Sequence, residues 1–295
     1  MATIAFVGLG NMGNPMAANL VKGGHRVIGF DLIEANRNIA RENGVEVSFS
    51  GAEALAEATV IFTMLASGKQ VLDIYSELAP MAQADSLFVD CSTIDVISAR
   101  SAHDIAQDYG HRSVDAPVNG NVMIAAEAKL TIMTGGAEAA IKDAHSLLTV
   151  IGEQIVHCGA PGSGQAAKIC NNMILGITML GVTEAFMLAE SLGLSARALY
   201  DVATVSSGDC WSLRHHCPVP ETVPDAPSNH NYDAKFSSYL MLKDLRLAQQ
   251  TAIETGTLTP LATQATQLFA MHNKAGNASK DISSIIEMFL TPTGR

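Results

Sequence analysis

The sequence has few charged and few aromatic residues, and it lacks any run of basic side chains. Charged residues make up 16% of the 295 positions and aromatic residues 5%, and the net charge is −11. An acidic chain without a Lys/Arg cluster is a poor partner for nucleic acid or for an anionic membrane surface. The hydrophobic content of 48% is typical of a folded globular protein, and the length allows two domains with separate cores.

Cysteine is also scarce, and no two cysteines form a CxxC pair. This pattern favours free thiols in a reducing compartment, and no charged leader precedes the first apolar stretch, so we expect a cytoplasmic protein. The spacing of the cysteines and histidines between 210 and 217 matches no common zinc finger, so no metal is expected. The five cysteines are Cys91, Cys158, Cys170, Cys210 and Cys217.

No uninterrupted apolar run is long enough to predict a membrane span. The most apolar segment, 170–192, is broken by polar and acidic side chains, namely Asn171, Asn172, Glu184 and Glu190. We therefore expect a buried helix there, and no membrane partner.

The first half of the chain alternates short β-type runs with helical patterns. Such alternation is typical of an α/β fold with a doubly wound parallel sheet. After residue 162 we find only helical patterns, led by a long apolar one over 164–192. We predict an α/β domain at 1–162 and an all-helical domain at 163–295 that begins with a long interdomain helix. The predicted strands lie in 3–8, 26–31, 58–65, 85–93, 111–118, 130–136 and 151–159.

A glycine-rich turn joins the first predicted strand to the first predicted helix. In VGLGNMG, the first glycine permits a tight turn, the second lets the backbone approach a pyrophosphate, and the third allows close helix–sheet packing. The helix start adds free N–H groups for the phosphates, so a Rossmann-type dinucleotide site is predicted. The turn consists of Gly8, Leu9, Gly10, Asn11, Met12 and Gly13.

An acidic residue at the end of the second strand indicates which dinucleotide binds. Asp31 can accept hydrogen bonds from the adenosine ribose and would repel a 2′-phosphate. Leu32 and Ile33 follow it, so no immediate arginine is available for such a phosphate. We expect NAD rather than NADP.

Three segments that end predicted strands are candidates for the walls of the site, because ligands of open α/β sheets lie outside the carboxyl ends of the strands. Turn chemistry alone would also explain the polar residues in any one of them. They are 63–66, 90–93 and 115–121, and in the last Asn119 and Asn121 flank Gly120.

The long apolar helix carries a lysine and an asparagine on one face. Lys168 and Asn172 are four residues apart. If that face borders a cleft, the lysine can take a proton from an alcohol, although a surface lysine that snorkels is the alternative. Lys243 and Asp244 lie on another amphipathic pattern, where a plain helix surface is the alternative. Trp211 could line a pocket or fill a core.

Several motifs in the same order resemble the β-hydroxyacid dehydrogenase family, and within it the 3-hydroxyisobutyrate dehydrogenases. The resemblance spans essentially the whole chain, and it implies oxidation of a small 3-hydroxy acid to a semialdehyde without metal, in a homodimer or homotetramer. The motifs are FVGLGNMGNPMAANL, VDAPVNGN, GQAAKICNN, SSGDCWS, NYDAKF and LMLKDLRLA.

The resemblance also implies roles for individual residues. The catalytic lysine falls on Lys168 and its substrate-binding companion on Asn172. The carboxylate loop of the family, usually Ser-Gly-Gly, falls on Asn119, Gly120 and Asn121, a departure that bears on substrate size. Substrate-pocket walls fall on Trp211 and Phe236. The nicotinamide side falls on Leu65, Ala66, Gln70, Thr93 and Lys243, with Asp244 as the partner of that lysine.

The function expected from this sequence is NAD-dependent oxidation of a small 3-hydroxy acid, with 3-hydroxyisobutyrate first and valine breakdown as the implied pathway. A semialdehyde reductase or a serine-type dehydrogenase of the same family is the nearest alternative. A non-catalytic NAD-sensing protein is the alternative from another class.

Overall fold

The computed structural model describes residues 1–290, so the last five positions of the predicted helical domain, 291–295, lie outside it. Contacts between Cα atoms divide the chain into a first unit, Met1–Lys168, and a second unit that starts at Ile169. Each unit is described by itself.

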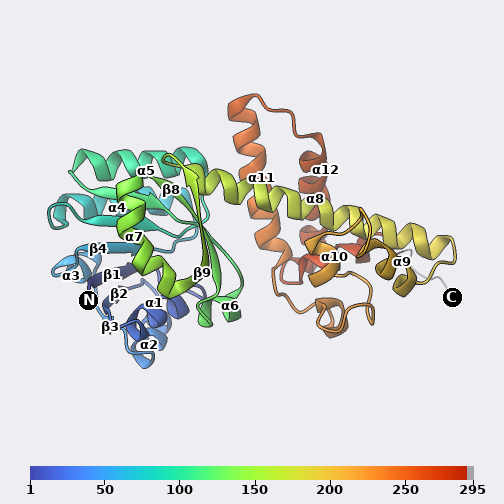
Figure 1. The fold of residues 1–295 in the computed structure, drawn as a ribbon, viewed down its shortest axis with the longest axis horizontal. Helices are drawn as coiled ribbons and strands as arrows, with labels where there is room; N and C mark the ends of the chain where they lie inside the picture. The colour runs from blue at the N-terminus through green and yellow to red at the C-terminus, as the bar shows by residue number, and fades with distance from the viewer. Residues whose placement is uncertain (291–295) are drawn as a thin grey trace. The chain divides into compact units, whose positions relative to one another are not determined.

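The first unit contains a nine-stranded, mainly parallel sheet (Figure 1). Six parallel strands run in the order β3-β2-β1-β4-β5-β6, which confirms the predicted doubly wound arrangement. The strands are β1 (Thr3–Val7), β2 (Arg26–Phe30), β3 (Glu46–Val47), β4 (Val60–Thr63), β5 (Leu87–Asp90), β6 (Arg112–Asp115), β7 (Val118–Asn119), β8 (Leu130–Gly136) and β9 (Gly152–Gly159).

The sheet departs from the predicted parallel pattern at β8. This strand runs antiparallel to both β6 and β7, whereas β9 pairs with it in parallel. Only ten residues, 120–129, separate β7 from β8. A parallel crossover needs a dozen or more, so the short connection makes the two strands antiparallel. The sequence did not predict β3 or β7, because a two-residue strand shows no periodicity.

Helices cover both faces of the sheet, and each face has its own apolar core. One core includes Leu20 of α1, Ala40 of α2 and Leu148 of α7, and the other includes Leu55 of α3 and Leu78 of α4. The first face is covered by α1 (Gly13–Lys22), α2 (Glu34–Glu42), α6 (Val122–Ala126) and α7 (Glu138–Ile151). The second is covered by α3 (Gly51–Leu55), α4 (Gly68–Leu78) and α5 (Val96–Asp108), and a short 3₁₀ turn, η1 (Ala79–Met81), follows α4.

A buried carboxylate holds the first turn of the long helix α8 (Ser163–Ser191) against the sheet. Asp115, the last residue of β6, accepts hydrogen bonds from the backbone N–H groups of Gly162 (2.8 Å) and Gln165 (3.0 Å). A negative charge at a helix N-terminus is favourable because the free N–H groups there carry a partial positive charge. The ring of His103 lies 2.9 Å from the same carboxylate, and Ser113 Oγ contacts its other nitrogen. This network connects three elements of the first unit.

The second unit is helical, as predicted. Between residues 169 and 290, β-pairing is limited to two isolated bridges, Asp233–Lys280 and Ser237–Asp281. Its core joins Met179, Leu213, Leu245, Phe269 and Ile285 from separate segments. Besides most of α8, it contains α9 (Ala196–Ala203), α10 (Trp211–His215), η2 (Pro227–His230), α11 (Ser238–Thr255), α12 (Pro260–His272), η3 (Asn273–Asn277) and η4 (Ile282–Met288).

By length and composition α8 could cross a membrane, although core helices of soluble proteins share those properties. Its first turn is held by the Asp115 carboxylate, and Met179, Leu180 and Phe186 along it belong to the core of the second unit.

Replacement of Asp115 tests this anchor. We expect D115N to lower the free energy of unfolding by about 1–3 kcal/mol, because an amide accepts through only one oxygen and places a donor against backbone N–H groups. Asp201, which forms an exposed i,i+4 pair with Arg197, offers the matched control. D201N should change stability by less than about 0.5 kcal/mol. Equal effects of both substitutions in urea unfolding would contradict the anchoring role.

Candidate functional site

The glycine turn between β1 and α1 has the shape of a phosphate-binding loop. Gly8 has a φ of +95°, and a Cβ there would lie 2.3 Å from the carbonyl oxygen of Met64. A Cβ on Gly13 would lie 1.9 Å from the carbonyl oxygen of Gly8, whereas one on Gly10 would meet no atom within 4 Å. The backbone at Gly10 therefore faces open space, where a pyrophosphate can approach, and the residues present fit a dinucleotide.

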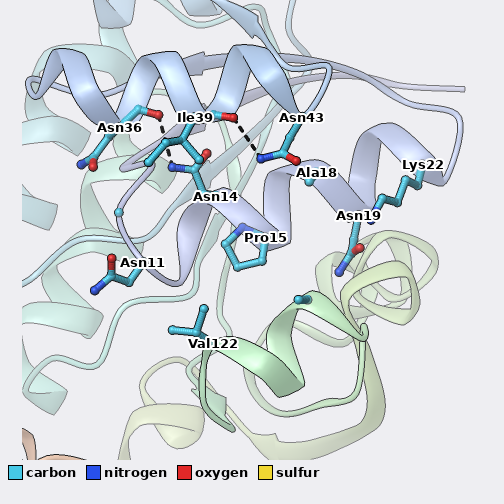
Figure 2. A pocket seen from close by; sticks show the side chains of 12 residues that line it. Asn11, Asn14, Pro15, Ala18, Asn19, Lys22, Asn36, Ile39, Asn43 and Val122 are labelled. Carbon is cyan, nitrogen blue, oxygen red and sulfur yellow. Dashed lines mark hydrogen bonds between the residues drawn. The ribbon is translucent and has the colours of Figure 1, made fainter.

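The side chain of Asn14 holds the glycine turn to α2. Its Nδ2 donates to the carbonyl oxygen of Leu9 and, at 3.2 Å, to that of Asn36 in α2. Figure 2 shows this side chain beside a cavity of about 340 Å³ that α1, α2 and α6 enclose. Asn14 is not among the residues predicted for the site. The available signal was a polar residue directly after the last glycine, at a position that the helical pattern buries.

The carboxylate of Asp31 is held between the glycine turn and α2. One oxygen accepts from the backbone N–H of Leu9 and the other from that of Ile33, each at 2.8 Å. These bonds orient the carboxylate beside the turn, at the carboxyl end of β2. A ribose hydroxyl can still donate to it, because each carboxylate oxygen accepts more than one hydrogen bond.

Asp90, a buried residue at the end of β5, holds the backbone of the segments that follow β4 and β5, where the nicotinamide side is predicted. Asp90 Oδ1 accepts from Thr63 Oγ1 (2.7 Å), from Ser92 Oγ (2.6 Å) and from the backbone N–H of Ser92. Ser92 Oγ in turn accepts from the backbone N–H of Leu65 (2.8 Å). Burial raises the pKa of the Asp90 carboxyl, although these donors act to lower it. Asp90 therefore determines, through Ser92, where the backbone at Leu65 lies.

Three other predicted residues of that side, Ala66, Gln70 and Thr93, follow the ends of β4 and β5, whereas Lys243 belongs to α11 of the second unit. Ala66 donates its backbone N–H to Gln70 Oε1 (3.0 Å), so the glutamine closes the loop that leads into α4. Thr93 follows the end of β5 and is half-buried.

The predicted carboxylate loop and the predicted catalytic lysine contact one another. Lys168 is only 5% exposed, and its Nζ donates to Asn119 Oδ1 at 2.9 Å. Gly120 has a φ of +136°, a conformation that favours glycine. Asn121 caps α6, because its Oδ1 accepts from the backbone N–H of Ile124 (3.0 Å). Capping uses only the amide oxygen, so its N–H groups are available to a ligand.

In the second unit, Asn172 is oriented by its neighbours. Its Nδ2 donates to Asp244 Oδ2 at 2.5 Å, and its Oδ1 accepts from Asn171 Nδ2 at 3.0 Å. Asn172 and Asp244 are both buried. The resemblance assigned Asp244 as the partner of Lys243, which stays a prediction, but the contact with Asn172 was not foreseen. No sequence spacing indicates it, because 72 residues separate the two side chains.

Phe236 and Trp211, the two predicted pocket residues of the second unit, both contact a buried pair formed by Asp281 and His216. Asp281 Oδ2 accepts from the backbone N–H of Phe236 (3.0 Å), and its Oδ1 lies 2.8 Å from His216 Nδ1. Trp211, which is half exposed, packs its ring on those of His215 and His216. Their spacing in the sequence suggested these histidines only as zinc ligands, and no pattern singled out Asp281. Within residues 1–290, no group of three metal-binding side chains converges.

Comparisons with known proteins match nearly the full length of the chain to dehydrogenases of one family. A family model of the NAD-binding domain of 6-phosphogluconate dehydrogenase matches residues 3–159, and one described as the NAD-binding domain of NADP-dependent 3-hydroxyisobutyrate dehydrogenase matches residues 162–289. A probable 3-hydroxyisobutyrate dehydrogenase of Mycobacterium bovis is 46% identical over 97% of each chain. The mitochondrial 3-hydroxyisobutyrate dehydrogenase of Mus musculus is 40% identical over 96% of this chain and 86% of its own.

A solved structure shows the same similarity. The 3-hydroxyisobutyrate dehydrogenase of Mycobacterium tuberculosis, determined with L-serine, has a TM-score of 0.97 at 45% identity, and the match covers 99% of this chain and 100% of that one.

Alanine at two glycines of the turn should separate folding from binding. We expect G13A to lower the free energy of unfolding by about 1–3 kcal/mol, because its Cβ would overlap the carbonyl oxygen of Gly8. G10A has open space, so its melting temperature should stay near the wild-type value while its affinity for NADH falls. Thermal melts and NADH fluorescence titrations measure the two effects. A G10A variant that binds NADH as well as wild type would contradict the placement of the pyrophosphate.

Proposed function

The chain belongs to the 3-hydroxyisobutyrate dehydrogenase family of NAD(P)-dependent hydroxyacid oxidoreductases, and we propose that it oxidises a small 3-hydroxy acid with NAD, 3-hydroxyisobutyrate first among them. The product of that reaction is methylmalonate semialdehyde, and the pathway it serves is valine breakdown. The two mycobacterial relatives and the mouse enzyme support the substrate by their names.

The observation that carries this proposal is the buried side-chain nitrogen of Lys168, which is bonded to Asn119. A buried lysine is unfavourable unless it is paired or used, and here it faces the loop that the family uses for the substrate carboxylate. As the neutral amine, Lys168 takes the hydroxyl proton when the alcohol is oxidised and becomes an ammonium, and it returns that proton in the reverse direction. Its bond to Asn119 Oδ1 holds Nζ at one position.

The neighbouring side chains bind and orient the acid. Asn119, Gly120 and Asn121 hold the carboxylate through amide and backbone N–H groups. Asn172 lies one helical turn beyond Lys168 on α8 and orients the reacting oxygen, while Asp244 and Asn171 hold its amide. Trp211 and Phe236 form the apolar wall of the pocket.

The cofactor is held by the first unit's glycine turn. Gly8, Gly10 and Gly13 leave room for the pyrophosphate, with Leu9, Asn11 and Met12 beside it, and Asp31 accepts from the adenosine ribose. NAD bound there would supply the nicotinamide ring as hydride acceptor for the oxidation of the alcohol. The surroundings of that ring are Leu65, Ala66, Gln70, Thr93, Lys243 and Asp244.

The organisation and location of the protein form part of the same proposal. Residues 1–162 are the NAD-binding domain, and residues 163–295 are the substrate and oligomerisation domain of a homodimer or homotetramer. The enzyme is cytoplasmic, which its five free cysteines support, because free thiols suit a reducing compartment. Neither nucleic acid nor a membrane is a partner.

Serine oxidation is the second candidate. The Mycobacterium tuberculosis relative was determined with L-serine, and serine is itself a 3-hydroxy acid with a carboxylate at the same distance from the hydroxyl. The asparagine pair at 119 and 121, in place of the usual serine and glycine of the family, changes the polarity of the loop that would hold the serine carboxylate.

A panel of substrates tests the reaction. We expect the purified protein to form NADH fastest with 3-hydroxyisobutyrate, compared with 3-hydroxypropionate, serine and tartronate, each with NAD and with NADP. Faster turnover of serine than of the other three acids would support serine oxidation as the function. NADH binding without turnover of any of the four acids would favour an NAD-sensing protein instead.

Lysine replacement tests the mechanism. We expect K168A to lower kcat by roughly 10²–10⁴-fold, the usual contribution of a positioned acid/base group, without loss of NADH binding. Lys129, an exposed lysine that pairs with Glu127, provides the control, and K129A should keep kcat within about twofold. Near-normal turnover by K168A would remove the lysine from the mechanism.

A further inference from the structure

Arg37 lies at the edge of the adenosine subsite, although it follows Asp31 by six residues in the sequence. It belongs to the first turns of α2, and its Nη1 donates to the carbonyl oxygen of Asp31 at 2.6 Å and to that of Leu32 at 3.1 Å. The guanidinium is therefore held against the β2–α2 turn. No arginine stands directly after Asp31, and only the fold brings this one to the same place.

The turn around Arg37 is open to a ligand. Leu32 is 86% exposed and Ile33 59% exposed, so the surface beside the Asp31 carboxylate is not filled by side chains of the first unit. Arg37 itself is half-buried, which limits the positions that its guanidinium can take. Both bonds to the turn use a single terminal nitrogen, and a guanidinium carries five N–H donors in a fork that matches phosphate oxygens.

Two opposite charges therefore flank the place where the 2′ position of the ribose would lie. The Asp31 carboxylate accepts a ribose hydroxyl and repels a 2′-phosphate, whereas Arg37 attracts a phosphate. Within residues 1–290, no ion pair joins Arg37 to a carboxylate. Glu34, in the first turn of the same helix, is exposed to solvent. The negative charge of Asp31 therefore favours NAD, which has a free ribose 2′-hydroxyl, over NADP, which carries a 2′-phosphate.

We propose that Arg37 is a specificity-determining residue that attracts the 2′-phosphate of an adenosine dinucleotide, and that the Asp31 carboxylate offsets this attraction in the unaltered protein. This inference rests on the adenosine site of the proposed function. It follows that removal of the charge at residue 31 is enough to admit NADP, with no arginine introduced.

Binding of two nicotinamide-free probes tests the proposal by calorimetry. Adenosine 2′,5′-bisphosphate carries the 2′-phosphate, and adenosine 5′-diphosphate is the reference that all variants share. We expect D31N to bind the bisphosphate about tenfold more tightly than wild type does, the size of effect that one charged contact gives. D31N/R37A should lose that gain.

Arg41 offers a matched control. It lies one helical turn beyond Arg37 on α2 and is exposed, and its Nη1 donates to Asn38 Oδ1 (2.8 Å) rather than to the turn. D31N/R41A removes the same charge from the same helix and should keep the gain. Equal affinity of D31N and D31N/R37A for the bisphosphate, or equal losses in both double variants, would overturn the assignment.

A second comparison keeps the test decisive if D31N does not fold, because Asp31 also accepts from Leu9 and Ile33. In the unaltered background, R37A should bind the bisphosphate several-fold more weakly than R41A does, and equal affinities would overturn the proposal. These probes involve no turnover. If the protein oxidises no hydroxy acid but R37A weakens bisphosphate binding, the proposed function is wrong and the role of Arg37 is supported. If the protein is active but R37A and R41A bind the bisphosphate equally, the role of Arg37 is wrong and the proposed function is unaffected.

Discussion

The contact between the Asp115 carboxylate and the first turn of α8 is the interaction on which the candidate site depends. Lys168 lies less than two turns after Gly162 on that helix, so the bonds to Gly162 and Gln165 determine where the lysine stands beside the sheet. Asn119 follows β6 by only four residues, and it reaches Lys168 Nζ. A single carboxylate at the end of one strand thus places both the loop and the lysine that this loop contacts.

The same principle recurs at each predicted part of the site, where a buried polar residue holds the backbone that would meet a ligand. Asn14 holds the glycine turn, and Asp90 acts through Ser92 on the backbone at Leu65. Asp281 holds the backbone at Phe236 in the second unit. Buried polar groups are costly unless they are satisfied, and satisfied networks rigidify the structure around them. The proposed ligand contacts are therefore supported by residues that need not touch a ligand.

Local chemistry made much of this protein predictable from its sequence. The glycine turn is recognisable within six residues by the spacing of its glycines. Only the constraint on Gly13 is local, because a Cβ there would meet the carbonyl oxygen of Gly8, whereas a Cβ on Gly8 would meet that of Met64 in a distant segment. The alternation of strands and helices predicted the doubly wound sheet, and the loss of alternation after residue 162 predicted the helical second unit. Lys168 and Asn172 stand on one face of α8, as their spacing of four predicted.

Only the tertiary structure decided the features that join residues far apart in the chain. The antiparallel course of β8, the bond between Asn172 and Asp244, and the arrival of Arg37 at the turn after Asp31 have no signature in local periodicity. Sequence patterns report which residues are buried and which elements form, since both depend on near neighbours. Which buried polar groups become partners depends on packing between elements, because each such group must find a hydrogen-bond partner wherever the fold brings one.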